Sequence, residues 1–332
     1  MTQAVQTQGL TKKYKTALAV NNIDIQVPQG CCCGFLGKNG AGKTTTIKML
    51  VGLIRPTAGK IEMLGQEQHF GQQNATVFGY LPDVPNFYGY MTGGEFLALC
   101  ANICKIPSKE AKQRIKDLLK LVGLDKTRTK IAGYSRGMKQ RLGIAQAMIN
   151  HPKIIFMDEP MSALDPMGRR DVAEIIQSLK GTTVIFSTHI LADVENVCDY
   201  ILIIEKGKIV AQDNMESLRR RHSENTAKIR FYQENDAKLF QAKAKEAGIT
   251  IDSLDMPQEL LLNAPDGQME NLSRTTTSII NANNLAVEIF AAHTPSLEDI
   301  FYKEIAKEVS VNNSQREFSH QPNNTADEGG MR

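Results

Sequence analysis

The sequence predicts an α/β fold with a mostly parallel core sheet, followed by a small α+β domain. Between residues 31 and 204, short apolar runs alternate with stretches of helical periodicity, which is the pattern of strands joined by crossover helices. One of these runs leads into a glycine-rich loop that opens a helix. After residue 228 the order changes to βαββαβ, which is typical of a ferredoxin-like domain. The 332 residues are enough for both domains.

The first elements lead into and out of the glycine-rich loop. Residues 1–30 carry short β patterns broken by turn residues, and we expect them to form an antiparallel edge of a larger sheet. Residues 31–36 are continuously apolar, as in a strand buried on both faces. A helix should begin near Gly42 and end before Pro56, with residues 60–64 as the next strand. That helix carries its apolar side chains on one face: Ile47, Leu50, Val51 and Ile54.

The middle of the chain continues this alternation. Residues 108–122 have the apolar face of a helix that Gly123 can end, and a second helix should span about 137–150. A buried strand at 154–157 is followed by two acidic residues. Asp165 can cap the next helix with Pro166 at its first position. Strands at 182–187 and 200–204 complete the series.

The C-terminal part reads as a separate unit. Its predicted strands are 229–232, 249–254, 259–262 and 285–290, and its predicted helices are 236–247 and 269–282. A last helix begins at Ser296, which pairs with Asp299 as in a capping box.

These patterns divide the chain into domains. Residues 1–220 form the large domain, with a helical part at about 84–150, and residues 221–227 form a linker. Residues 228–309 form the accessory domain, and the Asn-, Ser- and Gln-rich residues 310–332 form a disordered tail. The basic cluster at 219–222 could contact phospholipid headgroups or nucleic acid, but a solvated linker is the simpler interpretation.

Composition limits the possible partners and compartments. The chain has 39 basic and 36 acidic residues, a net charge of +3, which gives no reason to expect a nucleic-acid partner. The six cysteines lack paired spacing and indicate reduced thiols in a cytosolic protein, with the run at 31–33 buried rather than forming a metal or redox site. No 18-residue apolar stretch predicts a transmembrane segment, and residues 1–8 lack a signal-peptide pattern.

Residues 37–44 spell GxxxxGK[ST], a phosphate-binding loop. Glycines allow backbone N–H groups to approach an anion closely, and the following helix directs its unpaired N–H groups and positive dipole end at the same point. Lys43 would reach the outer phosphates, and the Thr44 hydroxyl would bind Mg²⁺. The residues expected to bind nucleotide here are Gly37, Asn39, Gly40, Ala41, Gly42, Lys43, Thr44 and Thr45.

Three further polar residues follow predicted strands. Asp158 and Glu159 lie at the carboxyl end of one strand, where open α/β sheets bind their ligands, and His189 lies at the end of the next. Asp158 can share Mg²⁺ with Thr44, while Glu159 can polarise an attacking water. His189 could hydrogen-bond the γ-phosphate. Taken alone, the two acids could instead cap a helix, and the histidine could be a turn residue.

Five motifs together resemble those of ATP-binding-cassette (ABC) proteins, over roughly residues 1–220. In chain order they are the loop at 37–45, the segment 134–141, the strand and acids at 154–160, the segment 162–165, and Ser187 to His189. The resemblance implies a P-loop NTPase fold of ABC type with antiparallel β and helical subdomains. It also implies the roles of catalytic glutamate for Glu159 and switch histidine for His189.

The same resemblance implies further site residues. Tyr14 matches the aromatic residue that stacks on adenine, and Asp165 matches the acid of the D-loop. Ser135 and Gly137 match the signature motif, which in this family contacts ATP held by the other cassette of a dimer. The signature departs from Leu-Ser-Gly-Gly-Gln at its first, third and fifth positions. Asp83 stands where the family usually has Gln or Glu, and we expect it to bind Mg²⁺ directly or through water.

The function implied by the resemblance is ATP hydrolysis coupled to membrane transport. The implied partners are a separate transmembrane permease, docked on residues 84–130, and a second ATP-binding subunit in a homodimer. The chain would then lie at the cytoplasmic face of the membrane, with ATP and Mg²⁺ bound. The signature, the acid after residues 79–82 and the ending at 295–301 resemble the drug, antibiotic and polysaccharide exporter branch. An importer ATPase and a soluble, non-transport ABC ATPase remain the alternatives.

Overall fold

The computed structural model describes residues 2–71, 77–223, 226–253, 256–264, 268–293 and 295–306. It divides into two units, one of Met1–Met215 with Phe301–Arg332 and one of Glu216–Ile300. The predicted tail at 310–332 lies outside the described residues. None of the helices within these described ranges is long and apolar enough to cross a membrane.

The core sheet of the first unit has the strand order β11-β10-β4-β9-β8-β7. All neighbours run parallel except β11, which pairs antiparallel with β10. Every residue of β8 and β9 is buried, as continuous apolar runs require. The parallel core predicted from the sequence is confirmed. Its strands are β4 (Cys32–Leu36), β7 (Phe78–Leu81), β8 (Ile154–Asp158), β9 (Thr183–Thr188), β10 (Tyr200–Glu205) and β11 (Lys208–Asn214).

The N-terminal strands form a second sheet. The strands of residues 1–30 are antiparallel, as predicted, but they do not form an edge of the core sheet, because both edges of β1 are already paired, to β2, β3 and β5. The two sheets instead share one hydrophobic core, to which β1 contributes Val5 and Leu10, β4 contributes Phe35, and the first helix contributes Ile47. The strands are β1 (Gln3–Tyr14), β2 (Ala17–Ile23), β3 (Gln26–Pro28), β5 (Ala58–Met63) and β6 (Gln66–Glu67).

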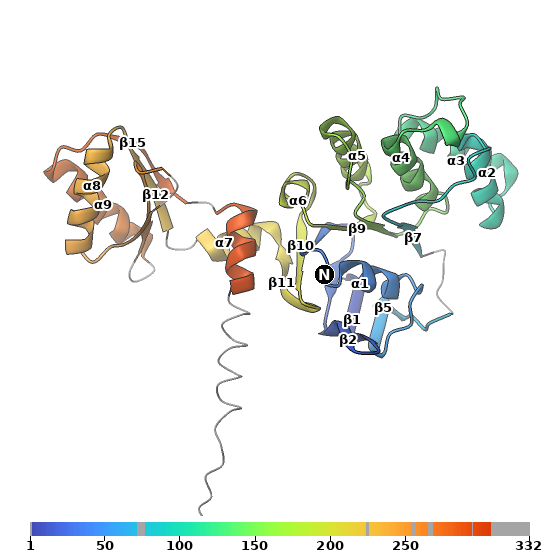
Figure 1. Ribbon diagram of the computed structural model, residues 1–332, viewed down its shortest axis with the longest axis horizontal. Helices are drawn as coiled ribbons and strands as arrows, with labels where there is room; N and C mark the ends of the chain where they lie inside the picture. Colours follow the sequence, from blue (N-terminus) through green and yellow to red (C-terminus); the bar gives the residue numbers. More distant parts are fainter. Residues whose placement is uncertain are drawn as a thin grey trace, which may run out of the picture. The chain divides into compact units, whose positions relative to one another are not determined.

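Helices cover the core sheet, with α1 on one face and α5 and α6 on the other (Figure 1). The helix predicted at 108–122 is α3, and Gly123 follows it with a φ of 64°. The predicted cap is present on α5, where the Asp165 carboxylate accepts a bond from the Gly168 N–H at 2.8 Å. The helices are α1 (Lys43–Leu50), α2 (Gly93–Ile103), α3 (Ser108–Leu121), α4 (Arg136–Ala147), α5 (Pro166–Ser178) and α6 (Leu191–Val197), with a 3₁₀ turn η1 (Ile131–Gly133).

The second unit has the predicted βαββαβ order. Its antiparallel sheet runs β13-β14-β12-β15, which is the ferredoxin-like strand arrangement, and α8 and α9 pack with it around one apolar core. The elements are β12 (Thr226–Phe231), α8 (Glu234–Glu246), β13 (Thr250–Ser253), β14 (Glu259–Asn263), α9 (Met269–Ala282) and β15 (Val287–Ala292).

The basic cluster at 219–222 differs from the linker that we expected at 221–227. It lies in helix α7 (Met215–Ser223), and β12 already begins at residue 226. Met215 and Leu218, three residues apart, are buried, while Arg220 is exposed. Met215 and Leu218 give α7 a short apolar face. This face is hard to recognise in the sequence because charged residues surround it. A last helix at 297–306 begins with the predicted Ser296–Asp299 box, in which the Asp299 N–H bonds the Ser296 Oγ at 3.1 Å.

Candidate active site

The glycine-rich loop joins β4 to α1 and requires glycine at two positions for steric reasons. A Cβ on Gly37 would lie 2.5 Å from the carbonyl oxygen of Ile204, and one on Gly42 would lie 2.7 Å from that of Ala19. Gly42 also has a φ of 115°, which other residues rarely adopt. Gly42 is the N-cap of α1 and has no side chain that could accept a hydrogen bond from the first turn. The N–H groups of that turn therefore remain available to a ligand at the start of the helix. This end of α1 is suited to an anion.

Lys43 places a buried ammonium group at this helix end. Its side chain is only 5% exposed, and Nζ donates to the carbonyl oxygen of Gly37 at 2.7 Å. It also lies 3.4 Å from Glu159 Oε1. A buried ammonium group needs such partners, and a phosphate oxygen would be an equally suitable one.

Asp158 ends β8 as a fully buried carboxylate with two hydroxyl donors. Thr44 Oγ1 donates to Asp158 Oδ1 at 3.0 Å, and Ser187 Oγ donates to the same oxygen at 2.7 Å. Ser187 also accepts the backbone N–H of Glu159 at 3.0 Å. No role was predicted for Ser187 itself, although it lies in the motif Ser187 to His189. Its role depends on its place opposite Asp158 in the β8–β9 register, which the sequence alone does not show.

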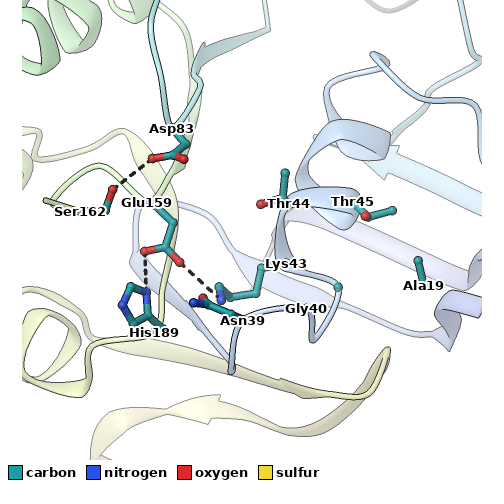
Figure 2. Close-up of a pocket in the computed structure, with 11 residues that line it drawn as sticks. Ala19, Asn39, Gly40, Lys43, Thr44, Thr45, Asp83, Glu159, Ser162 and His189 are labelled. Atoms are coloured by element: carbon teal, nitrogen blue, oxygen red, sulfur yellow. Dashed lines mark hydrogen bonds and ion pairs between the residues drawn. The ribbon is translucent and has the colours of Figure 1, made fainter.

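Glu159 lies between two cationic or donor groups, as Figure 2 shows. One carboxylate oxygen is 3.4 Å from Lys43 Nζ and the other is 3.0 Å from His189 Nδ1. The backbone of Glu159 has a φ of 49°, a left-handed conformation that is uncommon outside glycine. The turn after β8 therefore directs this carboxylate back over the phosphate loop, and such strained positions cluster at functional sites.

Lys43, Glu159 and His189 line a cavity of about 440 Å³, a size that suits a small ligand. Asp83 also faces it and accepts a hydrogen bond from Ser162 Oγ at 3.0 Å (Figure 2). Ala19 and Ser162 line the cavity although neither was predicted to do so. The predicted residues that line it are Asn39, Gly40, Gly42, Lys43, Thr44, Thr45, Asp83, Glu159 and His189.

Other predicted site residues do not line this cavity. Ser135 is the N-cap of α4, where its Oγ accepts the Met138 N–H at 3.2 Å, and Gly137 follows in the first turn. Asp165 caps α5. Tyr14 is 42% exposed at the end of β1, with Lys12 Nζ 5.0 Å from its ring centroid. Their roles toward ATP stay predictions.

The donor set suits a hard cation that also binds phosphate. Thr44 and Asp158 present a hydroxyl and a carboxylate together, which are oxygen ligands that Mg²⁺ accepts. Among the described residues, no group of three His, Cys, Asp or Glu side chains could hold a metal ion. A cation at this position would thus need oxygen ligands from phosphate or water as well. Nearby, burial together with Asp158 and Asp83 raises the pKa of Tyr80 to about 12, so its hydroxyl stays protonated.

Comparison with known proteins gives consistent matches. The sequence model described as "ABC transporter" matches residues 20–162. The uncharacterized ABC transporter ATP-binding protein YxlF of Bacillus subtilis is 36% identical over 298 residues, which cover 89% of this chain and 97% of that protein. The bacitracin transport ATP-binding protein BcrA of Bacillus licheniformis is 40% identical over 228 residues, covering 67% and 73%. A solved ATP-binding subunit of an ABC transporter is 30% identical, with a TM-score of 0.59 over 66% of this chain and 93% of that one.

Proposed function

Because the chain belongs to the family of ABC transporter ATP-binding proteins and is an ATPase of that family, we propose that it powers export through a separate membrane permease. Subunits of this family bind ATP and work with transmembrane partners. The finer assignments, namely the direction of transport, the dimer, the metal and the role of each residue, are inferred from the site and from the relatives.

The observation that carries the proposal is the position of Glu159. Its carboxylate lies 3.4 Å from Lys43 and 3.0 Å from His189, beside the Asp158–Thr44 pair. A carboxylate there can take up the proton of a water molecule that attacks the γ-phosphate. Lys43 neutralises phosphate charge, and His189 fixes the orientation of the Glu159 carboxylate. We assign Glu159, His189 and Lys43 as the catalytic residues.

We assign the metal position to Thr44 and Asp158, with Asp83 as an additional ligand or a ligand through water. Bound Mg²⁺ would neutralise negative charge on the phosphates. Ser187 and Thr44 both donate to Asp158 Oδ1, which leaves the second carboxylate oxygen available for the cation. Tyr14, exposed at the end of β1, is assigned to stacking on adenine.

The proposed working form is a homodimer in which ATP is bound between two subunits. Ser135 and Gly137 lie at the N-terminal end of α4, where backbone N–H groups and the helix dipole favour an anion. They are absent from the lining of this chain's own cavity, as is Asp165. These residues would therefore serve the ATP of the second subunit, and hydrolysis would release the dimer.

Export is proposed over import because the chain carries the exporter-like signature at 134–141. Its 40% identity to a protein named for bacitracin transport supports a role in transport. Residues 84–130 are assigned to permease docking. Val84, Tyr88 and Tyr90 are 64%, 52% and 66% exposed in this segment, which is more apolar surface than a solvated loop needs. The permease would keep the chain at the cytoplasmic face of the membrane.

Glu159→Gln tests the ATPase assignment. The amide keeps the size of the side chain but cannot accept the proton, so ATP should still bind while hydrolysis falls by about 10²-fold or more. Light scattering with Mg²⁺ and ATP should then detect a trapped dimer. Glu174→Gln on the exposed side of α5 is the matched control and should behave as wild type. Normal hydrolysis by Glu159→Gln would refute the assignment.

The direction of transport needs the partner. The permease that copurifies with the chain from membranes is identified and coexpressed with it in bacitracin-sensitive cells, with bacitracin as the probe. Export predicts higher tolerance that Glu159→Gln abolishes, and ATP-dependent accumulation of labelled bacitracin in everted vesicles. Accumulation in right-side-out vesicles instead would favour the importer.

A further inference from the structure

We propose that Arg169 on α5 is a positioning residue for ATP hydrolysis, because it fixes His189 against Glu159 through Asp193 and Thr188. This inference rests on the proposed roles of Glu159 and His189. It adds residues that do not line the nucleotide cavity, and it links the helix that Asp165 caps to the catalytic histidine.

The first link joins two helices. Arg169 Nε lies 3.2 Å from Asp193 Oδ1, and Nη2 of the same arginine contacts the same oxygen. Asp193 lies in the first turn of α6 and is only 7% exposed, whereas the Arg169 side chain is 31% exposed. A carboxylate buried to this extent depends on its ionic partner, so loss of the guanidinium would leave it uncompensated.

The second link fixes the backbone on both sides of His189. The Thr188 hydroxyl donates to Asp193 Oδ2 at 3.4 Å and accepts the Ile190 N–H at 3.0 Å. The Asp193 N–H also bonds the carbonyl oxygen of Ile190 at 3.2 Å. The residues before and after His189 are thus tied to one another and to Asp193.

Packing alone does not fix His189. Its side chain is 41% exposed, and its Nδ1 lies 3.0 Å from Glu159 Oε2. The direction of the imidazole ring therefore depends on the backbone at residues 188–190. Since catalytic geometry tolerates errors of less than about 1 Å, a loosened turn would cost hydrolysis more than nucleotide binding.

The third link leads back to the start of α5. Arg169 is four residues after Asp165, and its N–H bonds the carbonyl oxygen of Asp165 at 3.0 Å. A displacement of this helix start would move Arg169 and, through Asp193, the turn that carries His189. In the proposed dimer, closure at Asp165 could in this way set the position of the histidine.

Arg169→Ala is the first test. Single-turnover hydrolysis of radiolabelled ATP should slow by roughly 10- to 100-fold, while the Kd for ATP, measured without turnover, changes less than about twofold. Arg169→Lys should recover part of the rate, because it restores one charged contact with Asp193. Arg170→Ala, a neighbouring exposed arginine on α5, is the matched control and should hydrolyse ATP as wild type.

A double-mutant cycle separates positioning from a general loss of structure. If Arg169 acts through His189, then Arg169→Ala should change the single-turnover rate less than about twofold in a His189→Ala background. The same factor in both backgrounds, or an unchanged rate in Arg169→Ala alone, overturns the inference. If Glu159→Gln hydrolyses ATP normally, the proposed function itself fails. If Glu159→Gln is inactive and Arg169→Ala is normal, only this inference fails.

Discussion

Replacing Ser187 with alanine should both destabilise the protein and slow ATP hydrolysis. The hydroxyl is fully buried, donates to Asp158 Oδ1 at 2.7 Å and accepts the Glu159 N–H at 3.0 Å. The lost bond to a charged carboxylate is worth about 1.5–3 kcal/mol, and an unsatisfied buried N–H costs about 1–3 kcal/mol. Because Thr44 still donates to Asp158 and the Glu159 turn can relax, we expect a total loss of about 3 kcal/mol.

The lost stability should lower the melting temperature, and the lost contact should lower the rate of ATP hydrolysis. For a domain of this size, about 3 kcal/mol lowers the Tm by roughly 6–12 °C, measured by calorimetry. The rate of hydrolysis should fall about tenfold or more, since Glu159 loses the bond that fixes its strained backbone, while ATP binding is kept. Ser178→Ala, which removes one bond to the Ile175 carbonyl on α5, is the control and should leave hydrolysis unchanged. Wild-type Tm and rate in Ser187→Ala would refute the reasoning.

Three further predictions follow from single sites. Lys43→Ala should raise the Kd for ATP at least tenfold by isothermal titration, because the buried ammonium is the cation at the helix end; retained tight binding would contradict the phosphate-loop assignment. Gly42→Ala should also abolish tight ATP binding, since its Cβ would lie 2.7 Å from the Ala19 carbonyl oxygen. Burial raises the pKa of Cys31 from 9.0 to about 12, with smaller contributions from Asp199 and Cys32. The folded protein therefore holds the thiol proton more tightly than the unfolded chain does. This stabilises the fold fully below pH 9, and the stabilisation is lost as the pH rises toward 12. Cys31→Ala should therefore lose less Tm between pH 9 and 11 than wild type, and equal losses would count against this.

Sequence patterns predicted the helices and their ends well where the capping residues lie within a few positions of each other. The Asp165 cap with Pro166, the Gly123 stop and the Ser296–Asp299 box are all present, because capping is chemistry between residues a few positions apart. The end of helix α7, with the cluster at 219–222, was misread as linker because, among the residues of α7 up to 221, only Met215 and Leu218 are buried. Two apolar residues are too few to indicate a helix in a segment that also contains three consecutive arginines.

Long-range pairing was the part that sequence patterns could not supply. The strands of residues 1–30 were expected on the larger sheet, since a β pattern shows that a strand exists but not which strand it pairs with. One edge of the 12-residue β1 pairs with the nearby β2 and β3, but its other edge pairs with β5, for which the chain must return at 58–63. Nothing in the local pattern of either segment encodes that return.

Strand order also explains why some site residues were predicted and others were not. Thr44, Asp158, Glu159 and His189 each lie at or shortly after the carboxyl end of a strand, so their meeting at one edge of the sheet follows from the parallel topology alone. Ser187 has its role only because β9 lies between β4 and β8 and pairs Ser187 with Asp158. With β9 in that position, the residue opposite Asp158 must contact both the Asp158 carboxylate and the start of the Glu159 turn. A small hydroxyl side chain there can donate to the first and accept from the second, which alanine or valine could not do.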